Sequence, residues 1–221
     1  MTRESSKIKV ALIDDHVLLR DALAKMVDGI ENHDVIFVAG NGEEFIEKIR
    51  LNGPPNLVIL DLNMPKMDGF ETANWINKNH PKIKILVLTM YDSEVTLIRL
   101  LQAGARGFLK KDAHPHELSF AIKNVMENGY YYSSHTSNQL ANLFANKPNQ
   151  KETLERAMLN EREIEFLKMS STEMTYKEIA QAMGMNPRTL ENYRESIFNK
   201  LNIRSRVGLA LYAVKHGIVR F

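Results

Sequence analysis

The 221-residue sequence contains no cysteine. This absence excludes disulfides, thiolate metal sites and catalytic cysteines, and it suits a reducing cytoplasm, where we expect the protein to be located. No apolar run approaches the roughly 18–20 residues that a membrane-spanning helix needs. The first seven residues are polar and lead directly into a predicted strand, so they do not resemble a signal peptide. We therefore expect no membrane association.

The sequence also lacks a large net charge of either sign. The 29 Lys and Arg residues nearly balance the 27 Asp and Glu residues, which gives a net charge of +2. Such a small value does not by itself indicate a polyanionic partner. The basic excess lies within residues 151–221, whereas the preceding part is slightly acidic. This asymmetry is compatible with nucleic-acid binding by the C-terminal part.

Short apolar runs alternate with helical periodicity over the first 130 residues. The runs predict strands at 8–13, 35–39, 57–60, 83–88 and 106–109, and the segments between and after them predict helices at 17–30, 43–49, 70–79, 95–103 and 115–128. Strands that alternate with helices favour right-handed crossovers and a parallel sheet covered on both faces. We therefore predict an α/β fold, a doubly wound five-stranded parallel sheet of the flavodoxin-like order 2-1-3-4-5.

Polar residues collect where the predicted strands end. Read alone, Asp61 could simply cap a loop or a helix. In the predicted strand order, however, four such ends are neighbours and converge on one crevice. Crowded carboxylates favour a hard divalent cation such as Mg²⁺, a hydroxyl and an ammonium group can hold phosphoryl oxygens, and Asp is a competent nucleophile toward phosphorus. The converging residues, which together suggest transient phosphorylation of Asp61, are Asp14, Asp15, Asp61, Thr89 and Lys111.

The first half of the chain resembles the receiver domain of two-component response regulators. The motifs that carry the resemblance are the Asp14-Asp15 pair, the loop from Asp61 to Pro65 with Met67-Asp68-Gly69, Thr89, and the segment from Gly107 to Lys111. The resemblance implies that a sensor histidine kinase phosphorylates Asp61. It also implies that Mg²⁺ is bound by the Asp15 and Asp61 carboxylates and the Asn63 backbone carbonyl, with Asp14 acting through water. Thr89 and Lys111 would contact the phosphoryl group.

Three residues near these motifs have two interpretations each. The family pattern selects Lys111 as the active lysine, and alternation along a strand would direct Lys110 to the opposite side, as a solvated charge. Phe108 matches the aromatic residue of the family's rotamer switch, but it could equally be a core residue of an edge strand. We interpret His16 as a helix-start residue rather than a metal ligand, because no second His or Cys stands at ligand spacing.

The pattern changes after residue 129. Three consecutive tyrosines at 130–132 favour packing at a domain edge over base stacking, and residues 138–145 could form a short helix. The polar segment 146–150 contains a proline and is typical of a linker. We predict a receiver domain at 1–129, a linker at 130–152 and a DNA-binding domain at 153–221.

The last segment has only helical patterns. Asn160 with Glu163 resembles a capping box, Thr175 can cap a second helix, and Pro187 can occupy the first position of a third. The tight turn at 183–186 between two of these helices suggests a helix-turn-helix, although many small helical bundles also contain a glycine turn. We therefore predict a second, small all-α domain.

This second domain resembles the LuxR-type helix-turn-helix of NarL/FixJ response regulators. The resemblance rests on residues 159–163, 177–180, 188–190, 200–203 and 205–206. It implies binding to promoter DNA as a homodimer, at least after phosphorylation. The family often has a basic residue at the centre of the recognition helix, where this chain has Glu191, Asn192 and Glu195. Asn192, with or without Glu191, could read bases, or the glutamates could be only solvated charges. The predicted DNA-binding residues are Lys177, Arg188, Thr189, Asn192, Tyr193, Arg194 and Lys200.

The main hypothesis is a phosphorylation-switched transcriptional regulator that is not an enzyme. The enzymatic alternative is a Mg²⁺-dependent phosphatase with an aspartyl-phosphate intermediate. Such a phosphatase usually has a second Asp two residues after the nucleophile, where this chain has Asn63. A third alternative is an adaptor that works without phosphorylation, but the full set of acidic, hydroxyl and lysine residues argues against it.

Overall fold

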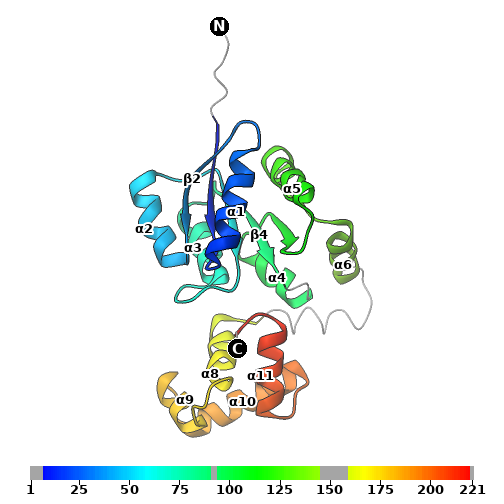
Figure 1. Cartoon of the computed structure of the whole chain (residues 1–221). Helices are drawn as coiled ribbons and strands as arrows, with labels where there is room; N and C mark the ends of the chain where they lie inside the picture. The colour runs from blue at the N-terminus through cyan, green and yellow to red at the C-terminus, as the bar shows by residue number, and fades with distance from the viewer. Residues whose placement is uncertain (1–6, 91–93, 145–158, 220–221) are drawn as a thin grey trace. The chain divides into compact units, whose positions relative to one another are not determined.

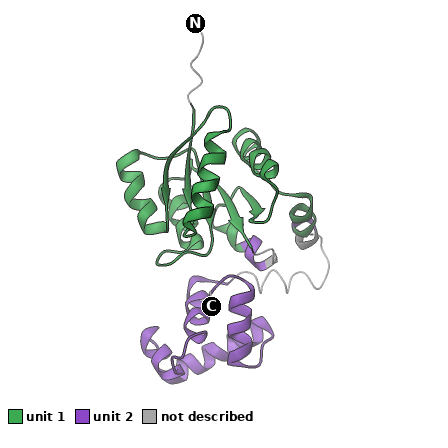
Figure 2. Ribbon diagram, viewed as in Figure 1, with its two compact units in different colours: residues 1–92, 99–139 green, residues 93–98, 140–221 purple. Residues whose placement is uncertain are grey.

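The computed structural model describes residues 7–90, 94–144 and 159–219 (Figure 1). The chain divides into two compact units (Figure 2). One comprises residues 1–92 and 99–139, and the other residues 93–98 and 140–221. Of the linker that we predicted at 130–152, residues 145–152 lie outside the described residues.

The first unit is built on a five-stranded parallel sheet. Its strand order, β2-β1-β3-β4-β5, confirms the predicted topology. The strands are β1 (Ile8–Ile13), β2 (His33–Ala39), β3 (Leu57–Asp61), β4 (Lys84–Thr89) and β5 (Gly107–Lys110). Because β1, β3, β4 and β5 are consecutive neighbours, their carboxyl ends lie along one edge of the sheet.

Helices cover both faces of this sheet, as Figure 1 shows. On one face, alternate strand residues such as Leu12 and Ile59 form a core with Ile122 of α5 and Val27 of α1. On the other face, Phe45 packs against Phe37 and Trp75. Strands buried on both faces are typically continuous apolar runs, as these are. The helices of this part of the chain are α1 (Val17–Asp28), α2 (Gly42–Asn52), α3 (Gly69–Asn79), α4 (Glu94–Gln102) and α5 (Pro115–Asn128).

The segment after α5 departs from its predicted boundaries. Gly129 ends α5 in the left-handed conformation, with φ of 89°. The chain then returns to the sheet, where the Tyr131 N–H donates to the Arg106 carbonyl and Tyr131 forms a parallel bridge with Gly107. Helix α6 (Ser134–Phe144) begins four residues before the predicted short helix. The reason is local, because the Ser133 hydroxyl accepts a hydrogen bond from the Thr136 N–H and caps the first turn.

In the second unit, the described residues 159–219 form four short helices that are amphipathic and pack on one core. Large side chains at its centre, including Phe166, Ile197 and Leu209, are fully buried. The helices are α8 (Glu161–Ser170), α9 (Tyr176–Ala182), α10 (Pro187–Leu201) and α11 (Arg206–Lys215). This arrangement confirms the predicted all-α unit. Throughout the described ranges, every helix is too short or too polar to cross a membrane.

Sequence signals define the helix starts in this unit. Asn160 and Glu163 form a reciprocal capping box at the start of α8, and Thr175 with Glu178 does the same for α9. Asn186 caps α10, and Pro187 occupies its first turn. Each cap satisfies N–H groups that would otherwise have no partner within the helix.

Candidate functional site

The carboxyl edge of the sheet brings together the residues predicted from the strand ends. Asp61 is the last residue of β3, Thr89 is the last residue of β4, and Asp14 directly follows β1. Lys111 directly follows β5, and its N–H donates to the Thr89 carbonyl at 3.1 Å. Asp14, Asp61 and Thr89 are each only 3% exposed. The parallel topology thus converts four distant sequence positions into one polar cluster.

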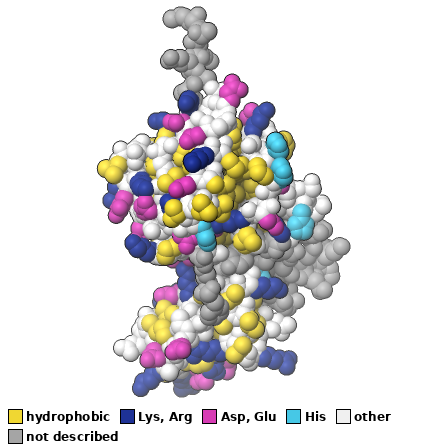
Figure 3. All heavy atoms as spheres, in the orientation of Figure 1, with side chains coloured by type: hydrophobic (Ala, Val, Ile, Leu, Met, Phe, Trp, Pro, Cys, Tyr) yellow, Lys and Arg dark blue, Asp and Glu magenta, His cyan; other side chains and the backbone are white. Residues whose placement is uncertain are grey.

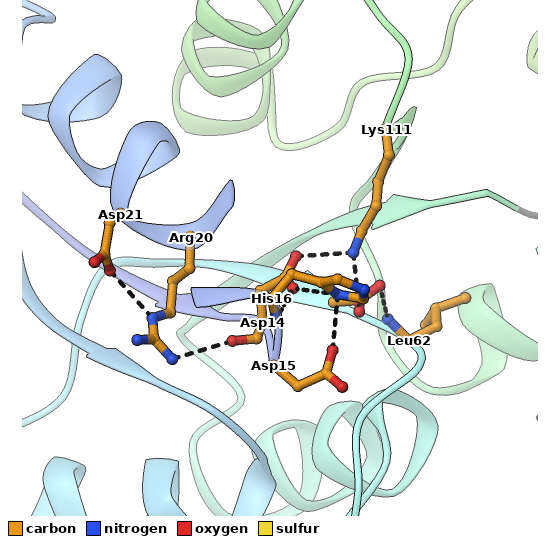
Figure 4. A network of polar contacts seen from close by, with 8 residues as sticks. Asp14, Asp15, His16, Arg20, Asp21, Leu62 and Lys111 are labelled. Carbon is orange, nitrogen blue, oxygen red and sulfur yellow. Dashed lines mark hydrogen bonds and ion pairs between the residues drawn. The ribbon is translucent and has the colours of Figure 1, made fainter. Parts of the chain in front are cut away.

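The ammonium group of Lys111 lies between two of the carboxylates. Its Nζ is 2.8 Å from Asp14 Oδ2 and 3.0 Å from Asp61 Oδ2. Figure 4 shows the Lys111 side chain reaching from its strand end to this cluster. Lys110 is exposed, whereas the Lys111 side chain is largely buried. The geometry therefore distinguishes the two adjacent lysines in the way that strand alternation predicts.

Asp61 is a buried carboxylate with a perturbed environment. Its Oδ1 accepts a hydrogen bond from the Leu62 N–H at 2.8 Å. Burial raises the pKa of Asp61 above its usual value, the Asp14 charge adds to that effect, and Lys111 opposes it. Burial makes the ionised form of Asp61 unfavourable, so a positive charge beside it stabilises that form.

The acidic cluster also has the donors that a divalent cation requires. Asp14, Asp15, His16 and Asp61 each offer one ligand atom, and these atoms lie within 4.8 Å of one another. Asp15 is partly exposed, so one side of the cluster is open to solvent. Several carboxylate oxygens with room for waters fit a hard cation such as Mg²⁺. The donor set therefore fits the metal that the sequence predicts.

His16 lies closer to this cluster than the sequence suggested. Its Nδ1 is 2.9 Å from Asp15 Oδ1 and 3.2 Å from Asp14 Oδ1. It occupies the N-cap position of α1, so its interpretation as a helix-start residue holds for the backbone, but the imidazole makes no capping hydrogen bond. The ring turns toward the carboxylates instead.

The loop between Asp61 and α3 is held tightly against the strand end. The Gly69 N–H donates to the Leu62 carbonyl, and Asp68 caps α3 in a reciprocal box with Glu71. A Cβ at position 69 would lie 2.2 Å from the Asp61 carbonyl oxygen, so only glycine fits there. Asn63 lies in this loop and is partly buried. The loop thereby fixes the backbone of the residues that follow Asp61.

Phe108 is a buried residue of β5 with one notable neighbour. Its ring stacks on that of Tyr132 with centroids 5.6 Å apart, and Tyr132 in turn stacks on Tyr130 at 5.8 Å. Burial raises the pKa of the Tyr132 hydroxyl. These contacts confirm the expectation that the tyrosine triplet packs at the edge of the first unit.

In the second unit, α9 and α10 form the predicted helix pair with a tight turn. Gly184 in that turn has φ of 64°, a conformation that favours glycine. Helix α10 buries Leu190, Ile197 and Leu201. Its opposite face is exposed and includes Arg188, Thr189, Glu191, Asn192 and Glu195. Figure 3 shows acidic and basic side chains interspersed on the visible surface of this unit.

Three of the predicted DNA-binding residues are engaged within the unit. Tyr193 packs edge-on against Phe166, and its hydroxyl is buried. The Arg194 guanidinium lies 5.0 Å from the centroid of the Tyr176 ring. Lys200 Nζ is 2.7 Å from the buried carboxylate of Glu163. The predicted residues whose side chains are exposed are Lys177, Arg188, Thr189 and Asn192.

Sequence reasoning missed the pairing of Glu163 with Lys200. It recognised Glu163 as part of a capping box, which is correct, but not as the partner of a lysine 37 residues away. One sequence signal for a partly buried Lys200 was available, because this residue directly precedes Leu201, which α10 buries.

Two family models match this chain. The model of the response regulator receiver domain matches residues 10–123, and that of the bacterial regulatory proteins of the luxR family matches residues 157–213. The two matches fall on the parallel-sheet unit and on the helical unit, respectively. The receiver match covers the whole strand-end cluster.

Curated relatives align with this chain over nearly their whole length. The chain is 36% identical over 212 residues to the response regulator GacA of Pseudomonas syringae pv. syringae, which covers 96% of this chain and 98% of the relative. It is 32% identical over 211 residues to the response regulator UvrY of Escherichia coli K12, which covers 96% and 95%, respectively.

Solved structures agree with the fold. RcsB from Salmonella enterica serovar Typhimurium, bound to promoter rprA in the presence of the phosphomimetic BeF₃⁻, matches with a TM-score of 0.67 and 21% identity over 93% of this chain and 98% of that chain. The family models and the relatives argue against the phosphatase alternative. The chain belongs to the two-component response regulators that combine a receiver with a LuxR-type, DNA-binding helix-turn-helix, a family of transcription regulators rather than enzymes.

Proposed function

We propose that Asp61 is the phosphoacceptor of this response regulator and that a sensor histidine kinase is its phosphodonor. The observation that carries the proposal is the Lys111 ammonium group, which lies 3.0 Å from Asp61 and 2.8 Å from Asp14. A carboxylate oxygen can attack phosphorus and form an acyl phosphate, while the donor leaves with the bonding electrons. The buried ammonium group would pair with a phosphoryl oxygen once formation of the acyl phosphate removes the charge of the Asp61 carboxylate.

Mg²⁺ is the proposed cofactor of this step. The Asp15 and Asp61 carboxylates and the backbone carbonyl of Asn63 would hold it, with Asp14 acting through water. Support comes from the clustering of the carboxylate oxygens and from the partial exposure of Asp15. When bound, the cation supplies positive charge that offsets the charge of the transferring phosphoryl group.

Thr89 and Phe108 are the proposed reporters of phosphorylation. Thr89 ends the strand next to β3 and is buried at the same sheet edge as Asp61. Phe108 lies on the neighbouring strand, with Val87 of β4 as its register partner. A hydroxyl that moves toward the phosphoryl oxygens would open space into which a neighbouring aromatic ring can turn. Phosphorylation would thus bias a receiver with two conformations.

The proposed output is binding of a homodimer to promoter DNA in the cytoplasm. Two recognition helices would enter adjacent major-groove half-sites. The exposed face of α10 supports Arg188, Thr189 and Asn192 as contacts to DNA, with Lys177 of α9 at the phosphates. The DNA contacts predicted for Tyr193, Arg194 and Lys200 stay a prediction, and the contacts of these residues within the second unit favour a role in holding α10. A structure of RcsB bound to promoter DNA supports the proposal by analogy.

The direct test is phosphorylation by a small acyl phosphate in the presence of Mg²⁺. We expect intact-protein mass spectrometry to detect one added phosphoryl group on the wild type and none on Asp61→Asn. Asp112→Asn is the matched control, because Asp112 is an exposed carboxylate next to Lys111. Phosphorylated wild type should also dimerise and bind promoter DNA more tightly. Equal phosphorylation of wild type and Asp61→Asn would rule out Asp61 as the acceptor.

A further inference from the structure

We propose that His16 is a ligand of the divalent cation and that its imidazole shifts the preference of the site from Mg²⁺ toward transition-metal cations such as Mn²⁺. The inference rests on the proposed function, because it concerns the same acidic cluster. It departs from the expectation drawn from the sequence, in which His16 had no metal role. Three observations about the position of the imidazole ring carry it.

The first observation is the spacing of the donor atoms. His16 Nδ1 is 2.9 Å from Asp15 Oδ1 and 3.2 Å from Asp14 Oδ1. Adjacent ligands of an octahedral ion with bonds of about 2.1 Å are separated by about 3.0 Å. His16 Nδ1 and Asp15 Oδ1 therefore already have the separation of neighbouring ligands in one coordination sphere, while Asp14 keeps its proposed role through water.

The second observation concerns what the imidazole does not do. His16 is the N-cap residue of α1, and N-cap side chains commonly accept a hydrogen bond from the first helical turn. The His16 ring makes no such bond, and its backbone N–H instead donates to Asp14 Oδ1 at 2.8 Å. The backbone turn directs the ring back to the carboxylates rather than along the helix.

The third observation is that the two carboxylate oxygens of Asp14 have different neighbours. Lys111 pairs with Oδ2, which leaves Oδ1 to the side occupied by His16. About half of the His16 side chain is exposed, so a hydrated cation can reach Nδ1 and the adjacent oxygens without opening the core. Figure 4 shows the ring of His16 beside Asp14 and Asp15, with Lys111 approaching from another direction.

The consequence follows from ligand chemistry. Mg²⁺ prefers oxygen ligands and gains little from an imidazole. Imidazole suits Ni²⁺ and Zn²⁺, and Mn²⁺, although it also favours oxygen donors, accepts a nitrogen ligand more readily than Mg²⁺ does. An all-carboxylate cluster would offer no nitrogen donor that favours these cations over Mg²⁺. Addition of one neutral imidazole nitrogen makes this cluster a mixed site, in which the identity of the bound metal depends on His16.

The test uses the full-length protein and pulsed electron paramagnetic resonance with Mn²⁺ as the probe. We expect a hyperfine coupling from a directly bound ¹⁴N nucleus in the wild type and in His114→Ala. The coupling should be lost in His16→Ala. His114 is the matched control because it is an exposed histidine that stacks on His116, away from the acidic cluster.

A calorimetric titration measures the preference itself. His16→Ala should weaken Mn²⁺ binding about tenfold, since even partners outside the coordination sphere contribute about 10–100-fold to metal affinity. Mg²⁺ binding should change by less than about twofold, because this cation relies on oxygen donors. A Mn²⁺ complex without nitrogen coupling, or an unchanged ratio of the two affinities, overturns the inference and leaves the carboxylate site standing. Failure of the wild type to bind either cation overturns both the inference and the proposed metal site.

Discussion

The ring of Phe108 stacks on that of Tyr132, with centroids 5.6 Å apart and planes 27° from parallel. Phe108 belongs to β5, and Tyr132 belongs to the segment that follows α5. Any rotation of the Phe108 ring must therefore displace Tyr132 or break the stack. The residue proposed to report phosphorylation is in direct contact with the chain that leads toward the second unit.

Tyr132→Leu tests the strength of this stack. A stacked aromatic pair contributes about 1 kcal/mol beyond the area that it buries. We expect the free energy of unfolding of the first unit to fall by about that amount in a urea titration. Tyr130→Leu is the control, because Tyr130 stacks on Tyr132 but is 59% exposed and should cost less. Equal losses for the two variants would mean that the contact with Phe108 adds nothing.

Lys111→Ala should destabilise the metal-free protein by about 3 kcal/mol, the typical result of removing one partner of a buried ion pair. The reason is that Asp14 and Asp61 would both remain buried without their shared cation. Added Mg²⁺ should recover part of the loss, which differential scanning calorimetry with EDTA or with Mg²⁺ can measure. Lys110→Ala, at an exposed position, is the control and should be near neutral. A similar loss for both variants would contradict the assignment of Lys111.

Asp61→Asn should change stability in a pH-dependent way. Burial raises the pKa of Asp61 in the folded protein above the model-peptide value of 3.8. Below that value the carboxyl is protonated in both states, so the wild type and Asp61→Asn should be equally stable. As the pH rises through the interval between the unfolded and the raised folded pKa, only the unfolded wild type ionises readily, and its folded state loses stability.

The measurement is therefore the difference in the free energy of unfolding between the two proteins, in EDTA, from pH 3.5 to 8. We expect Asp61→Asn to be the more stable variant at neutral pH and the difference to vanish in acid. Asp112→Asn, at an exposed position outside the acidic cluster, is the control. A difference of the opposite sign at neutral pH would mean that Lys111 more than offsets the cost of burial.

Gly69→Ala should disturb the loop that follows Asp61. The added Cβ would lie 2.2 Å from the Asp61 carbonyl oxygen and 2.6 Å from the Leu62 Cα, and backbone atoms cannot yield cheaply. We expect a loss of about 2 kcal/mol, as for other overpacked positions, together with slower phosphorylation by an acyl phosphate. Gly29→Ala is the control, because Gly29 has a right-handed helical conformation. If Gly69→Ala is phosphorylated as fast as the wild type, the conformation of this loop does not affect phosphorylation of Asp61.

Arg188 and Lys200 should respond differently to replacement by Ala. Arg188→Ala removes an exposed cation and should reduce the salt slope of DNA binding by about 1 without loss of stability. Lys200→Ala deprives the buried Glu163 of its partner and should lower stability by about 2 kcal/mol. Fluorescence anisotropy at several salt concentrations and thermal unfolding separate the two effects. If Lys200→Ala instead reduces the salt slope of DNA binding and leaves stability unchanged, Lys200 contacts a DNA phosphate rather than stabilising the fold.

Much of the fold was predictable because its signals are local. The apolar run that ends in Asp61 predicted a buried strand, and the alternation of strands and helices predicted the sheet order. The caps at Asn160 and Thr175 also depend on residues only three positions apart. The converging strand ends followed from the topology, and the family pattern together with alternation along the strand distinguished Lys111 from Lys110.

The features that were missed depend on side-chain directions or distant pairs. The sequence placed His16 at a helix start, but the direction of its ring depends on the turn after β1. The ion pair between Lys200 and Glu163 was not predicted, because the two residues are 37 positions apart in the sequence. The early start of α6 depends on a single hydroxyl, that of Ser133. None of these produces a periodic pattern.

The bridge between Gly107 and Tyr131 has a practical consequence for truncated proteins. Strand β5 is the last strand of the sheet, and an uncovered edge strand offers unpaired backbone groups to other chains. The Tyr131 N–H donates a hydrogen bond to one such group, the carbonyl of Arg106, which directly precedes β5. A receiver cut after residue 129 would expose this edge and also remove the ring that covers Phe108. Such a fragment should be more prone to aggregation than one that ends after residue 133.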